Sequence, residues 1–266
     1  MKRLPVLFLF LNFAVQAQQK ITWPDHKKAV IILTYDDALP SQLNIAIPQL
    51  DSAHLTGTFF LTGDINSDNI ARWRAASAKG YELANHTLYH PCLTTTETDK
   101  QLMPSEKYTV DEILREIYTM NSFLYAVDNK TTHTYAYPCT ETAVGGVDYV
   151  DSLRKSHLVK YARVGGDVDA VVTDFKNLDP LQVPSYGLEG NSTGDALIAF
   201  VKRVEDSGGM GIFMFHGIGG DYITTPAASH KQLLEYLQKH KNEIWVATFM
   251  QAMSYIDHEK KQTAFK

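Results

Sequence analysis

Long basic runs, internal repeats and a glycine-rich phosphate loop are all lacking from this sequence of 266 residues. The formal net charge is −5, and lysine and arginine occur next to one another only in pairs. This balance argues against nucleic acid as a partner. No glycine-rich loop follows the first predicted strand, and that absence argues against nucleotide binding.

Apolar runs long enough to span a membrane are also lacking, although a shorter one lies at the N-terminus. Residues 1–17 have the pattern of a secretory signal peptide, with a basic start, an apolar stretch at 4–13, and small residues at Val15 and Ala17. Cleavage before Gln18 removes two positive charges and changes the net charge from −5 to −7. No cysteine follows closely, which argues against a lipid anchor. We therefore expect an exported protein, secreted or periplasmic, with no membrane anchor.

Cysteine is scarce, since only Cys92 and Cys139 occur. In an exported protein an even number of cysteines makes a disulfide plausible. Two buried free thiols are the alternative.

Strand and helix patterns alternate from residue 28 onward. Such alternation is typical of βαβ units and a parallel sheet, and this length suits a single domain spanning 18–266. We predict an α/β fold, a distorted (β/α) barrel of about seven parallel strands, with an open doubly wound sheet as the alternative. Residues 165–190 are predicted to form a long functional loop containing a short strand. The predicted strands are 29–35, 58–62, 81–84, 133–137, 158–164, 210–215 and 244–247. The predicted helices are 39–52, 66–79, 110–127, 147–156, 195–205, 227–240 and a last one from 248.

Two adjacent carboxylates end the most apolar strand. The run at 29–33 is continuously apolar, as in a buried parallel strand, and it leads into Thr34-Tyr35-Asp36-Asp37. Neighbouring side chains on a strand point to opposite faces, so we expect the two aspartates to differ in role. Either can bind a metal or act as a base. An Asp-rich turn without a function is the alternative.

Polar side chains follow several other predicted strands. His86-Thr-Leu-Tyr-His90 follows the third, Cys139 follows the fourth, Arg163 ends the fifth, and His216 ends the run at 211–215. Singly, each residue is more typical of a structural role. The C-terminal ends of parallel strands meet at one edge, however, and α/β folds build their sites there.

These residue types together suit metal-assisted hydrolysis. One carboxylate and two imidazoles make a facial set for a divalent ion, and histidines at i and i+4 can face one ion if the segment is helical or turns tightly. A second carboxylate can take a proton from metal-bound water, and a histidine on the opposite rim can protonate a leaving group. Such a site hydrolyses a carbonyl compound without a covalent intermediate.

Four motifs within residues 28–255 together resemble the polysaccharide deacetylase family, also called carbohydrate esterase family four or the NodB-homology domain. The motifs are Thr34-Tyr-Asp-Asp37, His86-Thr-Leu-Tyr-His90, Tyr135-Ala-Tyr-Pro138 and Ile212-Phe-Met-Phe-His216. The resemblance implies a distorted (β/α) barrel that removes N- or O-acetyl groups from an acetylated carbohydrate with a divalent ion, usually Zn²⁺.

The resemblance also implies a role for each matching residue. Asp37, His86 and His90 are expected to hold the metal. Asp36 is expected to be the base that activates water, and His216 the acid that protonates the departing amine or alcohol.

The backbone N–H of Cys139 is expected to stabilise the oxyanion. Cys92 and Cys139 belong to loops that the resemblance places side by side at the barrel mouth, and we predict a disulfide between them. The candidates for lining the substrate pocket are Tyr137, Tyr186 and Trp245, with core packing as the alternative for Trp245.

The sequence departs from the family pattern at three places. Ala38 stands where the first motif usually ends in glycine, and Ala136 stands where many members carry an arginine that orients the base. We hypothesise that Arg163 supplies that charge from the neighbouring strand. The fourth motif, an Asp–Trp pair, has no clear counterpart and leaves the partner of His216 open. The candidate aspartates in that region are Asp167, Asp169, Asp174 and Asp179.

Two alternatives to a polysaccharide deacetylase remain. An O-acetyl xylan esterase or another small amidase would keep the same site, since pocket shape is set by the loops at 94–105 and 165–190. A carbohydrate-binding relative that has lost turnover is the non-enzymatic alternative. The presence of both Asp36 and His216 argues against it, because binding alone needs neither a base nor an acid.

Overall fold

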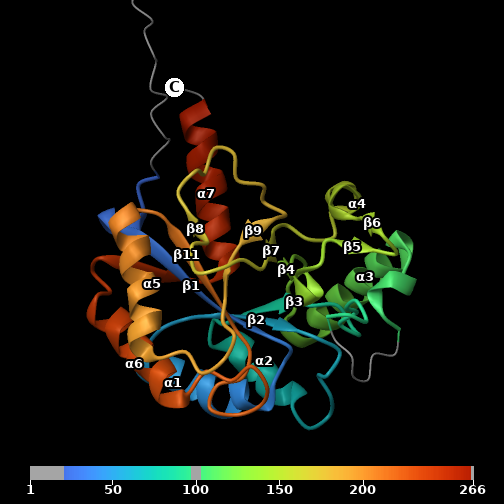
Figure 1. The fold of residues 1–266 in the computed structure, drawn as a ribbon, viewed down its shortest axis with the longest axis horizontal. Coiled ribbons are helices and arrows are strands. Elements are labelled where there is room, and N and C mark those ends of the chain that lie inside the picture. The colour runs from blue at the N-terminus through green and yellow to red at the C-terminus, as the bar shows by residue number, and fades with distance from the viewer. Residues whose placement is uncertain (1–20, 97–102, 265–266) are drawn as a thin grey trace, which may run out of the picture.

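The structure, a computed structural model, describes residues 21–96 and 103–264 (Figure 1). The predicted signal peptide and residues 97–102 of the loop at 94–105 lie outside these ranges. The strands of the main sheet are β1 (Ala29–Asp36), β2 (Thr58–Leu61), β3 (Glu82–Asn85), β4 (Tyr135–Ala136), β7 (Ala162–Val164), β8 (Val171–Val172), β9 (Val183–Pro184), β10 (Tyr186–Gly187), β11 (Met210–Phe215) and β12 (Ile244–Ala247). A separate hairpin contains β5 (Ala143–Val144) and β6 (Val147–Asp148).

Helices follow one another around the outside of the sheet in Figure 1. They are α1 (Ile47–Ala53), α2 (Ile70–Ala78), α3 (Val110–Asp128), α4 (Val150–Ser156), α5 (Gly194–Ser207), α6 (Ala227–Lys239) and α7 (Phe249–Ala264). The shorter helical turns are η1 (Pro24–His26), η2 (Gln42–Ala46), η3 (Ser105–Lys107) and η4 (Pro138–Thr140). No helix in the described ranges combines the length and apolar character needed to cross a bilayer.

The main sheet curls into a nearly closed barrel. Its strands run in the order β10-β11-β1-β2-β3-β4-β7-β9, with β12 beside β1 and β8 beside β11. All these pairings are parallel except that of β8 with β11. The two end strands, β9 and β10, are separated in sequence by Ser185 alone, so one extended segment joins both edges of the sheet. The predicted distorted (β/α) barrel is therefore confirmed, and the open doubly wound sheet is wrong.

β1 lies at the centre and is buried along its whole length. One face of β1 carries Ile31 and Leu33, which pack in a core beneath the outer helices. The other carries Val30 and Ile32, which pack in a second core inside the barrel. Burial on both faces explains the continuous apolar run that the sequence shows here. It also fixes the direction of Asp36, which shares the inward face with Val30 and Ile32.

The predicted helix start at Thr248 is confirmed at the N-terminal end of the barrel. The backbone N–H of Gln251 donates to Thr248 Oγ1 at 3.3 Å, and the N–H of Thr248 donates to Gln251 Oε1 at 3.0 Å. The N–H of Met250 donates to Glu82 Oε2 at 2.9 Å, so a buried carboxylate of β3 meets the start of α7. α7 therefore closes the end of the barrel opposite the C-terminal ends of the strands.

The segment at 147–156 differs from its prediction. Residues 147–148 form β6 of a hairpin, and the helix begins only at Val150. Gly145 and Gly146 join β5 to β6 with φ of 55° and 76°, a conformation that favours glycine and makes a tight hairpin turn. A side chain at Gly145 would also collide with the carbonyl oxygen of Tyr108, 2.4 Å from where its Cβ would lie. β5 and β6 have only two residues each, which is too short to show the alternating pattern of a strand in the sequence.

Candidate active site

β1 presents Asp36 and Asp37 to the C-terminal mouth of the barrel in two different directions. Asp36 is the last residue of the strand, and its carboxylate points into the barrel. Asp37 follows with φ of 81°, and Ala38 follows with φ of 58°. Such values are uncommon for residues other than glycine, and the value at Ala38 fits the glycine that the family pattern expects there. The turn directs the Asp37 carboxylate toward the loop after β3.

That loop carries His86 and His90 in a tight turn rather than a helix. The side-chain oxygen of Asn85 accepts from the N–H of Thr87 at 2.8 Å, and Thr87 Oγ1 accepts from the N–H of His90 at 3.0 Å. Thr87 and His90 both have positive φ, 63° and 50°. The two imidazole rings lie 4.6 Å apart between centroids. Side-chain hydrogen bonds to the backbone therefore shape the turn and bring both rings to one side.

Asp37, His86 and His90 form a set that fits a divalent ion. Asp37 Oδ1 lies 3.4 Å from Nε2 of His86 and 3.4 Å from Nε2 of His90. Ligand atoms bound to zinc at its usual distances and tetrahedral angles lie about 3.3–3.6 Å apart. Asp37 Oδ1 is buried and has no hydrogen-bond partner within residues 21–96 and 103–264, which suits an oxygen that binds a metal.

Both imidazoles are oriented by a contact at Nδ1. His86 Nδ1 lies 2.8 Å from the carbonyl oxygen of Ala136, which can only accept, so Nδ1 carries the proton. His90 Nδ1 lies 3.5 Å from Cys92 Sγ, a disulfide sulfur that carries no proton. Each ring is thus held with its Nε2 toward Asp37 Oδ1, an arrangement that outer contacts commonly impose on metal-binding histidines.

The electrostatics keep these groups in metal-binding form. Burial lowers the pKa of His86 to about 4, so the ring is neutral at pH 7. Burial by itself would raise the pKa of Asp37. The neighbouring imidazoles, His90 foremost, and the hydroxyl of Tyr222 outweigh that effect and lower the Asp37 pKa below its usual range. A neutral imidazole and an ionised carboxylate are the forms that bind a divalent cation.

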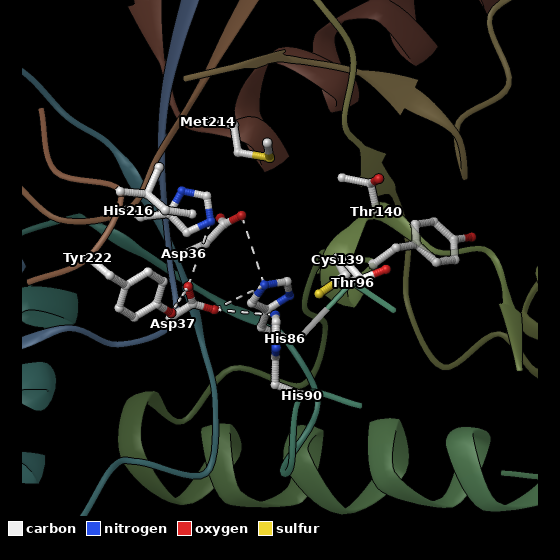
Figure 2. Close-up of a pocket in the computed structure, with 12 residues that line it drawn as sticks. Asp36, Asp37, His86, His90, Thr96, Cys139, Thr140, Met214, His216 and Tyr222 are labelled. Atoms are coloured by element: carbon white, nitrogen blue, oxygen red, sulfur yellow. Dashed lines mark hydrogen bonds and ion pairs between the residues drawn. The ribbon is translucent and has the colours of Figure 1, made fainter. Parts of the chain in front are cut away.

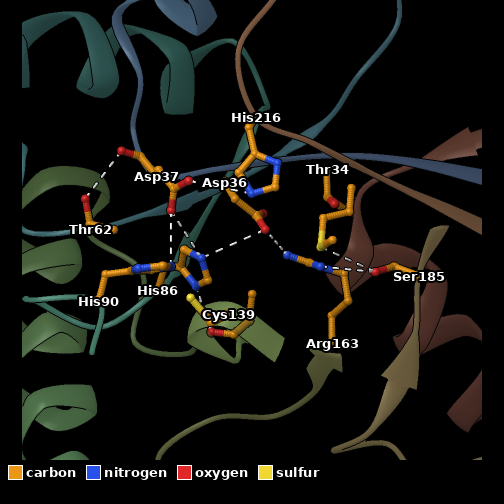
Figure 3. A network of polar contacts seen from close by, with 12 residues as sticks. Thr34, Asp36, Asp37, Thr62, His86, His90, Cys139, Arg163, Ser185 and His216 are labelled. Carbon is orange, nitrogen blue, oxygen red and sulfur yellow. Dashed lines mark hydrogen bonds and ion pairs between the residues drawn. The ribbon is translucent and has the colours of Figure 1, made fainter. Parts of the chain in front are cut away.

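Asp36 is paired with Arg163, as the sequence hypothesis proposed. Arg163 Nη2 donates to Asp36 Oδ2 at 2.5 Å, and Nη1 donates to Ser185 Oγ at 3.1 Å (Figure 3). Arg163 is the direct cross-strand neighbour of Ala136 in the β4–β7 pairing. The family pattern has its arginine at the position of Ala136, on β4. In this chain the guanidinium that pairs with Asp36 comes instead from Arg163, on the adjacent strand β7.

His216 lies across the cavity from Arg163, at the end of β11. Its Nε2 is 3.7 Å from Asp37 Oδ2. Its Nδ1 is buried and has no hydrogen-bond partner among the residues that the structure describes. Asp167 accepts from the N–H of Asp169, Asp174 accepts from Asn177, and Asp179 accepts from Arg154, so these three of the four candidate aspartates are engaged elsewhere.

A cavity of about 360 Å³ opens over these groups (Figure 2). The sequence-predicted residues that line it are Asp36, Asp37, His86, His90, Tyr137, Cys139 and His216. Tyr186 and Trp245 do not reach this cavity. Tyr186 packs against Phe200 and Phe213 beneath the outer helices. Trp245 packs against Trp23 and Tyr255. Both are large aromatics used for core packing, and Tyr137 alone of the three pocket candidates is at the site.

Five further residues line the cavity without having been predicted from the sequence: Thr96, Thr140, Met214, Tyr222 and Ile223. Tyr222 donates a hydrogen bond from its hydroxyl to Asp37 Oδ2. Tyr222 follows Gly217-Ile-Gly-Gly220, which lies directly after His216. These glycines indicate a loop at this point of the sequence. Nothing in residue type or spacing singles out the tyrosine itself.

The predicted disulfide between Cys92 and Cys139 is present, with the two Cα atoms 5.7 Å apart. It ties the loop that carries His90 to η4, the turn that contains Cys139. Cys139 is the second residue of that turn and has φ of 49°. Backbone N–H groups in the first turn of a helix have no partner within the helix. The bridge therefore holds the loop of His86 and His90 beside the backbone N–H of Cys139, the group expected to face the oxyanion.

Comparison with known proteins agrees with these motifs. The family model for polysaccharide deacetylase matches residues 24–152. That segment contains all three candidate metal ligands and Cys139 but neither Arg163 nor His216. A curated relative, the peptidoglycan-N-acetylmuramic acid deacetylase PdaA of Bacillus subtilis (strain 168), is 26% identical over 129 residues. The match covers 48% of this chain and 44% of PdaA, less than half of its length.

Solved structures share the fold at low sequence identity. A protein of Mycobacterium smegmatis has a TM-score of 0.66 and 16% identity, with 91% of this chain and 94% of that chain covered. A family 4 acetyl xylan esterase from Clostridium thermocellum, in complex with a cobalt ion, has a TM-score of 0.53 and 17% identity. In that case 85% of this chain and 90% of the other are covered. At these identities the likeness establishes the barrel alone.

The disulfide is expected to stabilise the metal loop even without metal. It closes a loop of 47 residues, so replacing both cysteines, Cys92→Ser with Cys139→Ser, should lower the free energy of unfolding by about 4 kcal/mol. Denaturant unfolding in the presence of a chelator measures this. A dithiol reductant should destabilise the wild type by a similar amount and leave the double variant unchanged. Equal unfolding midpoints for the two proteins would contradict the assignment.

Proposed function

We propose that this chain, which matches the polysaccharide deacetylase family model over residues 24–152, is a metal-dependent hydrolase that removes N- or O-acetyl groups from a carbohydrate. One observation supports this most directly. A carboxylate–imidazole set fit for a metal, a second carboxylate paired with a buried arginine, and a histidine on the opposite side all line one cavity. Each of these contacts by itself could serve only to stabilise the fold. A purely structural role does not explain why all these groups lie around one open cavity.

Asp37, His86 and His90 would hold the ion, and one carboxylate with two imidazoles is a set that Zn²⁺ binds well. A bound divalent ion lowers the pKa of water and polarises the acetyl carbonyl. Three protein ligands leave a position for water and substrate. These three side chains would hold an ion on the side of the cavity next to Asp36, since His86 Nε2 is 3.9 Å from Asp36 Oδ2.

Asp36 is proposed to act as the general base through Oδ1. Its Oδ2 is bound by Arg163, whereas Oδ1 is buried and has no hydrogen-bond partner in the described ranges. Oδ1 can therefore take the proton of the attacking water. Arg163 fixes the plane of the carboxylate, and Ser185 fixes Arg163, so the base is held in one orientation.

His216 is proposed to be the general acid. Its Nε2 faces the cavity on the side away from Arg163, and a proton on this atom can pass to the departing amine or alcohol. The backbone N–H of Cys139 would donate to the carbonyl oxygen as negative charge develops there. Acid, base and oxyanion donor thus come from three different elements around one cavity.

The substrate class follows from the chemistry and from the relatives. By its name, PdaA removes acetyl groups from N-acetylmuramic acid of peptidoglycan, and the Clostridium thermocellum structure is described as an acetyl xylan esterase. The same base, acid and metal ligands would serve an N-acetyl amide and an O-acetyl ester. The two substrates differ in the leaving atom that His216 would protonate, a nitrogen in the amide and an oxygen in the ester. An inactive carbohydrate-binding relative would need neither the ordered Asp36–Arg163 pair nor His216.

We also propose that the protein is exported. Two observations support this, the signal-peptide pattern at residues 1–17 and the disulfide. Disulfides form and persist in oxidising compartments and are rare in a reducing cytosol. The Cys92–Cys139 bridge joins two loops that shape the cavity, so the proposed enzyme would reach its oxidised form outside the cytosol.

Acetate release tests the proposed function. The protein should release acetate from at least one of three substrates: N-acetylated chitooligosaccharides, peptidoglycan fragments or acetylated xylan. A chelator should abolish release, and Zn²⁺ or Co²⁺ should restore it. Release that persists with the chelator would contradict the metal mechanism. Metal-loaded protein that releases acetate from none of the substrates would instead support a carbohydrate-binding role.

Arg163→Ala should lower kcat about a hundredfold, because the base loses the group that holds it in its productive orientation. Arg163→Lys should retain more activity, since it keeps the charge but loses the second hydrogen bond. Arg154→Ala is the matched control, because Arg154 pairs with Asp179 on the surface. Full activity in Arg163→Ala, with normal metal content, would remove Arg163 from the mechanism.

His216→Ala should lower kcat on an acetylated sugar by about 10²–10⁴-fold. The loss should be much smaller with 4-nitrophenyl acetate, because 4-nitrophenolate departs without needing a proton. His258→Ala, on the exposed face of α7, should change neither rate. Equal losses on both substrates would show that His216 does not act as the acid.

A further inference from the structure

Tyr222 contacts the proposed metal site from a loop that none of the matched motifs includes. Its hydroxyl donates to Asp37 Oδ2, while Asp37 Oδ1 faces His86 and His90. Figure 2 shows the Tyr222 ring beside Asp37, on the same side of the cavity as His216. The two oxygens of the Asp37 carboxylate therefore have different contacts. Oδ2 accepts from the phenol of Tyr222, and Oδ1 faces the proposed metal position.

The loop between β11 and α6 is built to hold this tyrosine in place. The N–H of Gly217 donates to the carbonyl of Tyr222 at 3.2 Å, and the N–H of Thr225 donates back to Gly217 at 2.8 Å. Asp221 accepts from the N–H of Ser41 at 2.8 Å, which anchors the loop to the segment after β1. A side chain at Gly217 would place its Cβ 2.1 Å from the carbonyl oxygen of Gly220, so only glycine fits there.

Asp221 and Ile223, on either side of Tyr222, both have positive φ, 62° and 44°. For a β-branched residue such as Ile223 this conformation is strained. The surrounding hydrogen bonds hold the strained backbone and direct the tyrosine at Asp37. A tyrosine that only covered the surface would not need so constrained a loop.

We propose that Tyr222 is a positioning residue that holds Asp37 as a one-oxygen metal ligand. The inference rests on the proposed metal site. By donating to Oδ2, the hydroxyl fixes the rotation of the carboxylate and keeps Oδ1 toward Nε2 of both histidines. Contacts of this kind to a metal ligand commonly change metal affinity by 10–100-fold when they are lost.

Asp37 Oδ2 also lies near His216. His216 Nε2 lies 3.7 Å from Asp37 Oδ2, and its ring lies 6.0 Å from the ring of Tyr222 between centroids. With the phenol bound to Oδ2, this oxygen already has a close donor. Tyr222 therefore binds the same oxygen of Asp37 that lies nearest to His216.

The test is metal binding by substrate-free protein. Tyr222→Phe removes the hydroxyl and keeps the ring, and it should raise the dissociation constant for Zn²⁺ about 10–100-fold in competition with a chromogenic chelator. The visible absorption bands of the Co²⁺-loaded variant should also shift, because the ligand field changes when Asp37 is free to rotate. Far-UV circular dichroism confirms that the variant is folded.

Ile223→Ala is the matched control, since Ile223 lies on the same loop and lines the same cavity but presents no polar side-chain atom to Asp37. Its Zn²⁺ affinity and Co²⁺ spectrum should equal those of the wild type. Wild-type affinity and spectrum in Tyr222→Phe, or an equal loss in Ile223→Ala, would overturn the inference. A wild-type protein that binds neither ion would overturn the proposed metal site as well, so the two failures are distinguishable.

Discussion

A buried carboxylate needs a charged partner, and in this barrel Asp36 has one in Arg163. Both side chains are almost fully withdrawn from solvent, with 3% of the Asp36 side chain and 1% of the Arg163 side chain exposed. Removing one partner of such a pair leaves an uncompensated charge, which typically costs about 3–5 kcal/mol. The pair spans the barrel interior from β1 to β7, so it forms only when the sheet has curled far enough to bring these strands to face each other. The geometry of the proposed base therefore depends on closure of the barrel.

Closure itself depends on a short segment. β9 pairs with β7 and β10 pairs with β11, and Ser185 lies between them. Ser185 donates to the carbonyl of Val164 at 2.8 Å and accepts from Arg163. The residue that joins the two edges of the sheet is thus the residue that holds the guanidinium. The closure of the barrel and the proposed site therefore share one hydrogen-bond network.

The other half of the site depends on loops rather than strands. Asp37 leaves β1 with positive φ, and the loop of His86 and His90 is shaped by side-chain hydrogen bonds and by a disulfide. The sulfur of Cys92 lies against His90 Nδ1, so the bridge also contributes to ring orientation. Strand ends therefore position the proposed base and acid, and loops position the candidate metal ligands. This division would give the two adjacent aspartates separate roles.

The sequence by itself determined the barrel, the strand ends and most of the charged groups of the site. Hydrophobic periodicity reports burial, and β1, β11 and β12 are buried enough for their limits to be read within a residue. The motifs identified Asp36, Asp37, His86, His90 and His216 as site candidates, because all of them lie at the end of a strand or in the loop that follows it. The sequence also indicated Arg163, which lies near the end of the strand that pairs with Ala136.

Only the tertiary structure decided which aromatic residues reach the cavity. Tyr186 and Trp245 pack in cores, whereas Tyr222 contacts Asp37 from a loop with no periodic signal. It also showed that His216 Nδ1 has no aspartate partner in the described ranges. The physical reason is the same in each case. Periodicity and spacing encode which face a residue takes on its own element, but a contact between distant loops depends on backbone turns and packing that no local pattern records.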